Sequence, residues 1–376
     1  MKKALMYASV ASMIQQFNMN NIKLLQELGY EVYVACNFEF GSTISNEKIS
    51  KLKEDLTNMN VKYYHIPVPR KISDFSNLYL SYKKTLKLMN ENKYNLIHCH
   101  SPIGGIICRI ANKHSKNYSN ARMIYTAHGF HFFKGNNPIK NFIFKNIERY
   151  GARFTDTLIT INKEDYNAAK KFKLKKNGTV EYVPGIGIDL DKINAIEGNK
   201  DDLCKELNIS TDSILLLSVG ELNQNKNHRV VIEQLDKLPD NVHYIICGQG
   251  ILKEEYESLA KEHNVQHRLH LLGYRDDVLK IMKSCDVFVF PSKREGLSVA
   301  LMEAMACKLI CVASRIRGNV DLENNNIYYF EKENVQQLND VIMKAINKRS
   351  ENVDLKQYSS KYINSVIRSI YVGNLY

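Results

Sequence analysis

The chain lacks the features that mark membrane-spanning, disulfide-rich and zinc-stabilised proteins. No apolar run approaches the roughly 18 residues that a spanning helix needs. The eight cysteines are scattered without a C-x-x-C pair, so the sequence predicts neither a disulfide framework nor a structural zinc site. The start, Met1-Lys2-Lys3 and an apolar stretch, is similar to a signal peptide, but no small-residue cleavage site follows and residues 4–8 fit a first strand. These absences favour a protein of the reducing cytoplasm.

Acidic residues are scarce in one half of the chain. Residues 1–190 hold 28 Lys and Arg against 14 Asp and Glu, a net charge of +14, whereas residues 191–376 hold 24 against 26, a net charge of −2. Such a split suits an anionic membrane surface or a nucleic acid, and solvated lysine faces are the plain alternative. We favour the membrane and expect no nucleic acid. The cations of the first half gather in two runs: Lys83, Lys84 and Lys87, and Lys170, Lys171, Lys173, Lys175 and Lys176.

A length of 376 residues, with 44% hydrophobic and 24% charged residues, predicts a soluble protein of two domains. Strand-like and helix-like segments alternate through both halves, which indicates α/β domains with parallel, doubly wound sheets that bind ligands at the carboxyl ends of their strands. Pro184, Gly185 and Gly187 interrupt the alternation. We therefore expect domains at 1–188 and 189–355, with a helical tail at 356–376. The expected strands of the first half are residues 4–8, 31–36, 61–68, 96–100, 123–128 and 158–161.

The most informative stretch is residues 291–303, Pro-Ser-Lys-Arg-Glu-Gly-Leu-Ser-Val-Ala-Leu-Met-Glu. It follows the short apolar run 287–290, typical of a buried strand, and runs into a predicted helix at 299–307. The N-terminus of such a helix suits a phosphate, and Gly296 lets the backbone approach it closely. Carboxylates beside a phosphate are better suited to sugar hydroxyls. Glu295 on the loop and Glu303, about two turns into the helix, therefore indicate a nucleotide sugar, with two incidental glutamates on a solvated helix as the alternative.

Glu295 and Glu303, eight positions apart after Phe290-Pro291-Ser292, resemble the signature of the retaining glycosyltransferases of family 4. This resemblance implies the GT-B fold, in which two Rossmann-like domains face each other across a cleft and the C-terminal helix returns to the first domain. It also implies a metal-independent enzyme with no cofactor, in keeping with the absence of a convincing D-x-D cluster. The sequence is most similar to the bacterial branch that builds capsule, exopolysaccharide or O-antigen units.

The same resemblance gives roles to residues of the second half. Glu295 binds hydroxyls of the transferred sugar and Glu303 the ribose, while Lys226 and the helix start hold the diphosphate. The family's second cation is missing, because its position is Glu221, and Arg294 or a residue of the basic domain is the expected substitute. The expected donor-binding set comprises Glu303, Gly296, Leu297, Ser298, Gly220, Asn225, Gly248, Arg275 and Arg294.

In the first half, His128 stands at the carboxyl end of a predicted strand and precedes Gly129, so it faces the ligand side of the sheet. By resemblance it donates a hydrogen bond to the transferred sugar or polarises it, and we count it as catalytic with Glu295 and Lys226. Ser9 and Ser12 stand in a short turn where many relatives carry paired glycines, and with His131 they form the expected acceptor side. His98 and His100 can be interpreted as metal ligands, but two ligands without a third do not make a site.

The sequence thus predicts transfer of a hexose or N-acetylhexosamine, with retention, from a nucleotide sugar, UDP-linked by preference, to a polyprenyl-diphosphate-linked saccharide. The expected location is the inner face of the cell membrane, as a peripheral protein, and no oligomeric state is predicted. Two alternatives remain open. One is a non-catalytic sugar-nucleotide-binding subunit of the same fold, and the other is a 2-epimerase that needs no acceptor.

Overall fold

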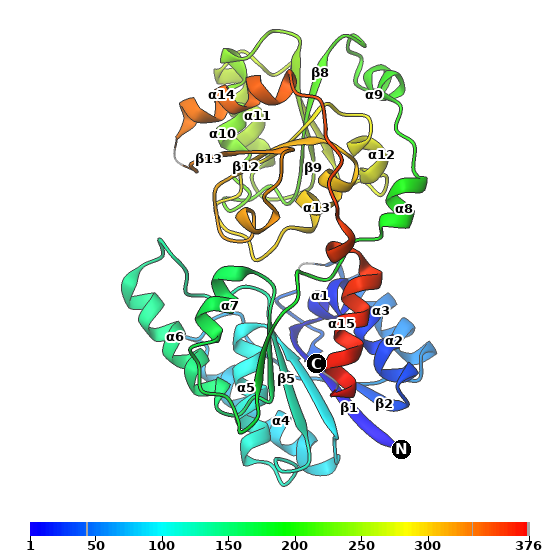
Figure 1. Cartoon of the computed structure of the whole chain (residues 1–376), viewed down its shortest axis with the longest axis vertical. Helices are drawn as coiled ribbons and strands as arrows, with labels where there is room; N and C mark the ends of the chain where they lie inside the picture. The colour runs from blue at the N-terminus through cyan, green and yellow to red at the C-terminus, as the bar shows by residue number, and fades with distance from the viewer. Residues whose placement is uncertain (43, 333, 374–376) are drawn as a thin grey trace. The chain divides into compact units, whose positions relative to one another are not determined.

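The computed structural model of the chain describes residues 1–42, 44–332 and 334–373. The chain divides into two compact units (Figure 1): the first unit comprises Met1–Ile186 and the segment from Ile363 onward, and the second unit comprises Gly187–Tyr362. Each unit has one parallel sheet covered by helices. The prediction of two Rossmann-like α/β domains is confirmed. The expected boundary at 188/189 lies two residues beyond the observed division, and residues 356–362 group with the second unit.

The sheet of the first unit has the strand order β3-β2-β1-β4-β5-β6-β7, and every pairing is parallel. The order changes direction between β1 and β4, and sheets of this kind bind ligands at the carboxyl ends of the two strands that flank such a point. The strands are β1 (Lys2–Val10), β2 (Tyr30–Asn37), β3 (Lys62–His65), β4 (Leu96–His100), β5 (Arg122–Ala127), β6 (Thr157–Thr160) and β7 (Thr179–Tyr182).

Polar residues that accept from free backbone N–H groups begin several helices of the first unit, including Ser45, Asp74 and Asn137. The helices are α1 (Ala11–Phe17), α2 (Met19–Glu27), α3 (Asn46–Asn58), α4 (Phe75–Glu91), α5 (Pro102–His114), α6 (Pro138–Ala152), α7 (Lys163–Ala169) and α15 (Ser360–Val372). Helix α15 places Ile363, Ile367 and Ile370 in the core beside β1 and α2. The tail of the chain is thus an integral part of the first unit.

Two strand predictions were wrong in extent, each for a local reason. The strand expected at 61–68 is only β3, because Pro67 and Pro69 cannot donate to a neighbouring strand. The first strand is longer than expected, since β1 continues through Val10 and α1 begins at Ala11. The short turn expected at residues 9–12 is therefore absent: a strand passes directly into a helix. Strand β7, an edge strand of half-exposed residues, was not expected, because it lacks a continuous apolar run.

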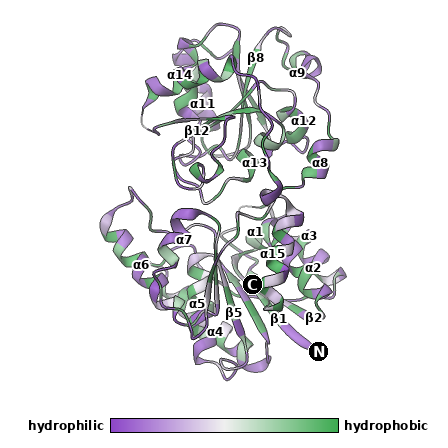
Figure 2. Cartoon of the chain, in the orientation of Figure 1, coloured by the Kyte–Doolittle hydropathy of each residue, from purple (hydrophilic) through white to green (hydrophobic). Residues whose placement is uncertain are grey.

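The sheet of the second unit has the order β10-β9-β8-β11-β12-β13, again all parallel, with its change of direction between β8 and β11. Both faces are covered, so its central strands are almost continuously apolar, and Figure 2 shows strand β8 coloured as hydrophobic. The strands are β8 (Ile214–Val219), β9 (Val242–Cys247), β10 (Leu269–Gly273), β11 (Val287–Phe290), β12 (Ile310–Ser314) and β13 (Ile327–Phe330).

The helices of the second unit lie on both faces of this sheet. They are α8 (Leu190–Ala195), α9 (Lys200–Leu207), α10 (Arg229–Ile232), α11 (Lys253–Glu262), α12 (Val278–Met282), α13 (Val299–Ala306) and α14 (Val335–Ile346), with 3₁₀ turns at Leu235–Lys237, Val320–Leu322 and Lys356–Tyr358. Among the residues that the structure describes, no helix is both long enough and apolar enough to cross a membrane.

Candidate functional site

The loops after β8 and β11 lie at the point where the second sheet changes direction, and hydrogen bonds join them. The Asn225 amide donates to the carbonyl of Arg294 (3.0 Å), and the backbone N–H of Lys293 donates to the carbonyl of Asn225 (2.8 Å). The Asn227 amide donates to the carbonyl of Pro291 (3.2 Å). Two segments about 65 residues apart in the sequence therefore form one rigid rim, where α/β sheets bind ligands.

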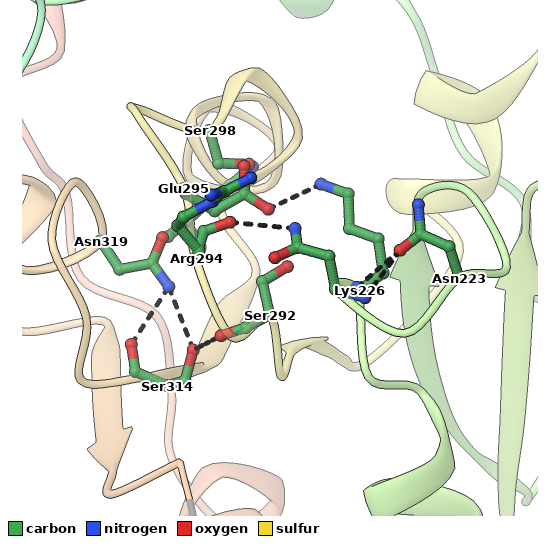
Figure 3. A network of polar contacts seen from close by, with 10 residues as sticks. Asn223, Lys226, Ser292, Arg294, Glu295, Ser298, Ser314 and Asn319 are labelled. Carbon is green, nitrogen blue, oxygen red and sulfur yellow. Dashed lines mark hydrogen bonds and ion pairs between the residues drawn. The ribbon is translucent and has the colours of Figure 1, made fainter. Parts of the chain in front are cut away.

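An ion pair between Lys226 and Glu295 lies at the centre of this rim. Lys226 Nζ lies 2.8 Å from Glu295 Oε1 and 4.8 Å from the centre of the Phe290 ring. The Asn223 side chain accepts from the backbone N–H of Lys226 and so fixes the loop that carries the lysine. Figure 3 shows the two charged groups pointing toward one another from opposite loops. The structure thus brings together two of the three residues predicted to be catalytic.

The start of α13 forms the second part of the site. Ser298 caps the helix, with its hydroxyl accepting from the backbone N–H of Leu301 (3.2 Å). Within the described chain, the backbone N–H groups of Gly296, Leu297 and Ser298 donate no backbone hydrogen bond. A helix start with free donors beside the Lys226 ammonium suits an anion such as a diphosphate.

The loop after β12 completes the rim, and it includes Arg317, for which the sequence left phosphate binding and a plain surface loop equally open. A Cβ on Gly318 would lie 2.3 Å from the carbonyl oxygen of Gly296, and φ at Gly318 is +82°, so only glycine fits this contact. The contact brings Arg317 to Glu295, whose carbonyl accepts from the guanidinium Nε (3.4 Å). Arg317 thereby joins Arg294 as a candidate for the missing second cation. The basic run 315–317 was the available signal, but spacing alone did not distinguish it from a surface loop.

Gly248 and Gly220 allow another close backbone approach, beside a pocket. A Cβ on Gly248 would lie 1.8 Å from the carbonyl oxygen of Gly220, so the two loops touch backbone to backbone. A pocket of about 380 Å³ opens there, at the carboxyl ends of β9 and β10. It is lined by Leu222, Gly248, Gln249, Gly250, Lys253, Leu271, Leu272 and Gly273. A pocket that combines three leucine side chains with polar groups and glycine backbone suits a flat heterocycle.

Glu303 is half-buried on α13, and within the described residues its carboxylate has no hydrogen-bond or ion-pair partner. Burial raises the pKa of this carboxyl, and the nearby Lys192 ammonium partly lowers it. Glu303 is the fifth residue of α13, so it lies little more than one turn into the helix and not two as expected. In its ionised form, a partly desolvated carboxylate of this kind is suited to accept hydrogen bonds from a ligand.

Two arginines of the expected donor-binding set differ in whether their charge is free to bind a ligand. Arg275 is already engaged: its guanidinium pairs with Asp277 (2.7 Å) and Glu206, and both bonds raise its pKa. Arg294 is exposed and its guanidinium has no partner in the described part of the chain. Glu221, at the position where an arginine was expected, is exposed. Of these three side chains, only Arg294 offers a free positive charge.

In the first unit, His128 belongs to a cluster of three histidines at the ends of β4 and β5. His128 Nε2 lies 3.0 Å from Nδ1 of His100, and the His100 ring lies 4.1 Å from that of His98. Burial lowers the pKa of His128 to about 4 and that of His98 to about 3. These imidazoles are therefore neutral at physiological pH.

Contacts beyond the cluster fix the tautomers of two of its rings. His100 Nε2 lies 3.2 Å from the sulfur of Met6, which can only accept, so Nε2 carries the proton and Nδ1 accepts from His128. His128 Nδ1 is then left as an acceptor. His98 bonds Tyr371 and Thr126, both at 2.8 Å, which ties the C-terminal helix to the cluster. The predicted role of His128 as a donor requires the opposite tautomer.

The three residues expected on the acceptor side are separated. Ser9 is the last residue but one of β1, and its hydroxyl accepts from the backbone N–H of Gly104 (3.0 Å), at the start of α5. Ser12 is buried in the first turn of α1. His131 packs edge-on against Phe144 (5.1 Å) and lines a small apolar pocket between α4, α5 and α6. Of the three, Ser9 is the one whose side chain bonds across the carboxyl ends of β1 and β4, to the start of α5.

Both units are similar in sequence to known glycosyltransferases. Residues 199–362 match the family described as glycosyl transferases group 1, and residues 10–162 match the family described as glycosyl transferase 4-like. EpsD of Bacillus subtilis (strain 168), assigned as a glycosyltransferase, is 30% identical over 327 residues, 85% of this chain and 81% of EpsD. The chain therefore belongs to the same glycosyltransferase family as EpsD.

Other relatives of this glycosyltransferase carry more specific names. The Escherichia coli UDP-Gal:α-D-GlcNAc-diphosphoundecaprenol α-1,3-galactosyltransferase is 28% identical over 93% of this chain and 89% of its own length. The structure of Anabaena HepE in complex with UDP and glucose superimposes with a TM-score of 0.74 at 17% identity, over 99% of this chain and all of HepE. The prediction of a GT-B glycosyltransferase fold is confirmed.

The described residues of the glycosyltransferase contain no group of three or more His, Cys, Asp or Glu side chains placed to hold a metal ion. His98 and His100 lie on one face of β4, but their ring nitrogens already bond Tyr371, Thr126, His128 and Met6. These two residues therefore do not fit a metal site, and metal independence stays a prediction.

Proposed function

We propose that this glycosyltransferase moves a hexose or N-acetylhexosamine from a UDP-sugar to a polyprenyl-diphosphate-linked saccharide, with retention of the anomeric configuration. The Lys226–Glu295 pair beside the free start of α13 carries the proposal, because it offers a cation and donors for a diphosphate next to a carboxylate for sugar hydroxyls. The E. coli galactosyltransferase, whose name specifies a UDP-sugar and a diphosphoundecaprenol acceptor, supports the choice of both substrates.

In the proposed mechanism the bond between the anomeric carbon and the diphosphate oxygen breaks while the acceptor hydroxyl attacks the same face. The diphosphate gains negative charge, which Lys226 and the α13 N–H groups stabilise. Its departing oxygen takes the proton of the acceptor hydroxyl, so no separate base is needed. Glu295 accepts from hydroxyls of the transferred sugar and Glu303 from the ribose. His128, neutral at physiological pH, accepts from a sugar hydroxyl through Nδ1.

The test is a screen of radiolabelled UDP-sugars against undecaprenyl-diphosphate-linked saccharides. We expect one sugar to enter the lipid fraction, with the α configuration of the donor preserved in the NMR coupling of the product. Inverted configuration would contradict retention. Binding of UDP without transfer to any acceptor would instead support the non-catalytic subunit, which the Glu221 departure favours, and a new nucleotide sugar formed without acceptor would indicate an epimerase.

We expect Glu303→Gln to weaken UDP binding by about tenfold, because a charge-assisted hydrogen bond to the ribose is lost. The same change should raise the Tm by about 1–3 °C at pH 7, since the partly desolvated charge is removed. Burial raises the pKa of Glu303, so the folded state holds its proton more tightly, and wild-type stability falls as pH rises through the raised pKa. The Tm gain should therefore disappear below pH 4.

Titration calorimetry with UDP and thermal unfolding from pH 3.5 to 8 check this prediction. Exposed Glu254→Gln, on α11, is the matched control and should change neither quantity. Wild-type UDP affinity in Glu303→Gln would contradict the ribose assignment.

We expect sugar transfer to persist in excess EDTA, because Lys226 and the helix start supply the positive charge that a metal otherwise brings to a diphosphate. The measurement is the initial rate before and after chelation and dialysis. Complete loss of the rate, restored by a divalent cation, would overturn the metal-independent mechanism.

We further propose that the protein acts at the inner face of the cell membrane as a peripheral protein. The net charge of +14 in residues 1–190 supports this location, since anionic lipids attract juxtamembrane cations.

A further inference from the structure

Helix α6 presents large apolar side chains to solvent. Ile139 is 71% exposed, Phe142 is 70% exposed and Ile143 is 46% exposed. Their spacing of three and four residues places them on one side of the helix, next to its first turns. A soluble protein seldom exposes such a group unless it binds an apolar partner.

A basic pocket adjoins the second half of the same helix. It measures about 260 Å³ and is lined by Asn146, Arg149, Tyr150, Arg153, Lys171 and Lys173. Its lining contains four cations and no acid, and within the described residues none of the four has an ion-pair or hydrogen-bond partner for its side chain. Four unneutralised cations around one cavity create a site for an anion.

The only acidic residue of α6, Glu148, points to the inner side of the helix, where an arginine neutralises it. Glu148 is buried and bonds Arg109 (2.9 Å) and the hydroxyl of Tyr125 (2.9 Å). Within the described residues, the outward side therefore has no acidic group, and besides the apolar residues and the pocket lining it carries the exposed Lys140 and Lys145. In Figure 2 hydrophobic and hydrophilic stretches follow one another along α6, at the edge of the first unit.

We propose that α6 and its basic pocket form the membrane-binding site of this protein. Ile139, Phe142 and Ile143 enter the acyl region, and the pocket binds the phosphate of an anionic phospholipid headgroup. The combination favours a membrane over nucleic acid, because aliphatic side chains beside a phosphate site match the layered chemistry of a lipid surface. The inference deepens the proposed function and rests on it for the membrane location of the acceptor.

The basic pocket includes only part of the lysine run 170–176 that the sequence analysis singled out. Lys171 and Lys173 line the pocket, whereas Lys170 lies over the Tyr166 ring (4.9 Å) and Lys175 pairs with Asp156 (2.8 Å). Arg149 of α6 and Arg153, which directly follows the helix, lie 18 or more residues away in the sequence and supply the other half of the positive charge.

Sedimentation of the full chain with phospholipid vesicles tests the proposal. Vesicles of phosphatidylcholine with 30% phosphatidylglycerol should bind the wild type at low salt, and pure phosphatidylcholine should bind it at least tenfold less. Arg149→Gln/Arg153→Gln should lose at least tenfold in affinity, at roughly fivefold per cation. Ile139→Ser/Phe142→Ser should retain weak binding at low salt and lose it in 0.5 M salt, where the Debye length falls to about 4 Å.

Matched controls distinguish vesicle binding at this site from binding that depends only on the net charge or on exposed apolar side chains in general. Lys23→Gln/Lys116→Gln removes two exposed cations elsewhere in the first unit, and Ile251→Ser removes an exposed apolar side chain of the second unit. Both should bind vesicles within twofold of wild type. An equal loss in the lysine pair would overturn the pocket, and so would tighter, Arg149- and Arg153-dependent binding of single-stranded DNA than of the vesicles.

UDP titration of the same variants distinguishes the two hypotheses. All variants should bind UDP as the wild type does, because none lies in the second unit's rim. Vesicle binding without UDP binding would refute the proposed function and leave the membrane site intact. UDP binding with no preference for anionic vesicles would refute the membrane site alone.

Discussion

Lys226→Met is expected to lower kcat/KM for sugar transfer by about 10²–10³-fold, the usual effect of removing a preorganised charge from a developing oxyanion. Lys226 is the cation of the β8 loop that faces the start of α13, and its ammonium is half-buried against Phe290. Methionine keeps the length of the side chain and its packing on the ring but removes the charge. UDP affinity should fall as well, since the diphosphate loses an ion pair.

Steady-state kinetics and UDP titration measure the two effects. Lys293→Met is the control, because Lys293 is an exposed lysine in the loop after β11 and should leave both quantities within twofold of wild type. An unchanged kcat in Lys226→Met would show that another cation, such as Arg294 or Arg317, stabilises the leaving diphosphate.

Glu295→Gln is expected to lower kcat by about 10²-fold while UDP affinity stays equal or rises. We expect kcat and UDP affinity to respond differently because Glu295 has two separate contacts. Its carboxylate is proposed to hold sugar hydroxyls, which UDP lacks, and it also pairs with Lys226 at 2.8 Å. Amide substitution weakens that pair, so the ammonium becomes more available to the diphosphate.

Parallel measurements of kcat with the UDP-sugar and of UDP affinity decide the assignment. A fall in UDP affinity as large as the fall in kcat would show that Glu295 positions Lys226 instead of binding the sugar. Glu254→Gln again serves as the control for loss of one acidic side chain.

The central strands were predictable because burial on both faces requires a run of apolar residues, which is visible in the sequence. Residues 287–290 form a continuous apolar run, and they are β11, a central strand of the second sheet. Where such a local signal is weak, prediction failed. Strand β7 is half-exposed at an edge, and α1 begins without a capping side chain or a break after β1.

The candidate site was predictable where it is contiguous. The spacing of Glu295, Ser298 and Glu303 is fixed by one loop and one helix, so the sequence placed them together. The ion pair of Glu295 with Lys226 spans 69 positions, and the approach of Gly318 to Gly296 depends on the order of β11 and β12 in the sheet. Spacing along the chain contains no information about such contacts.

The sequence by itself determined the α/β class, the two domains, the position of Glu295 just before a helix start and a first half with a charge of +14. Only the tertiary structure decided which charges are available. Folding pairs Lys175 with Asp156, Arg275 with Asp277 and Glu148 with Arg109. It leaves Arg149, Arg153, Lys171 and Lys173 around one pocket with no ion-pair partner among the described residues. The physical reason is that charges act over a few ångströms in space, so net charge counts residues, whereas binding depends on those that folding brings together and leaves unneutralised.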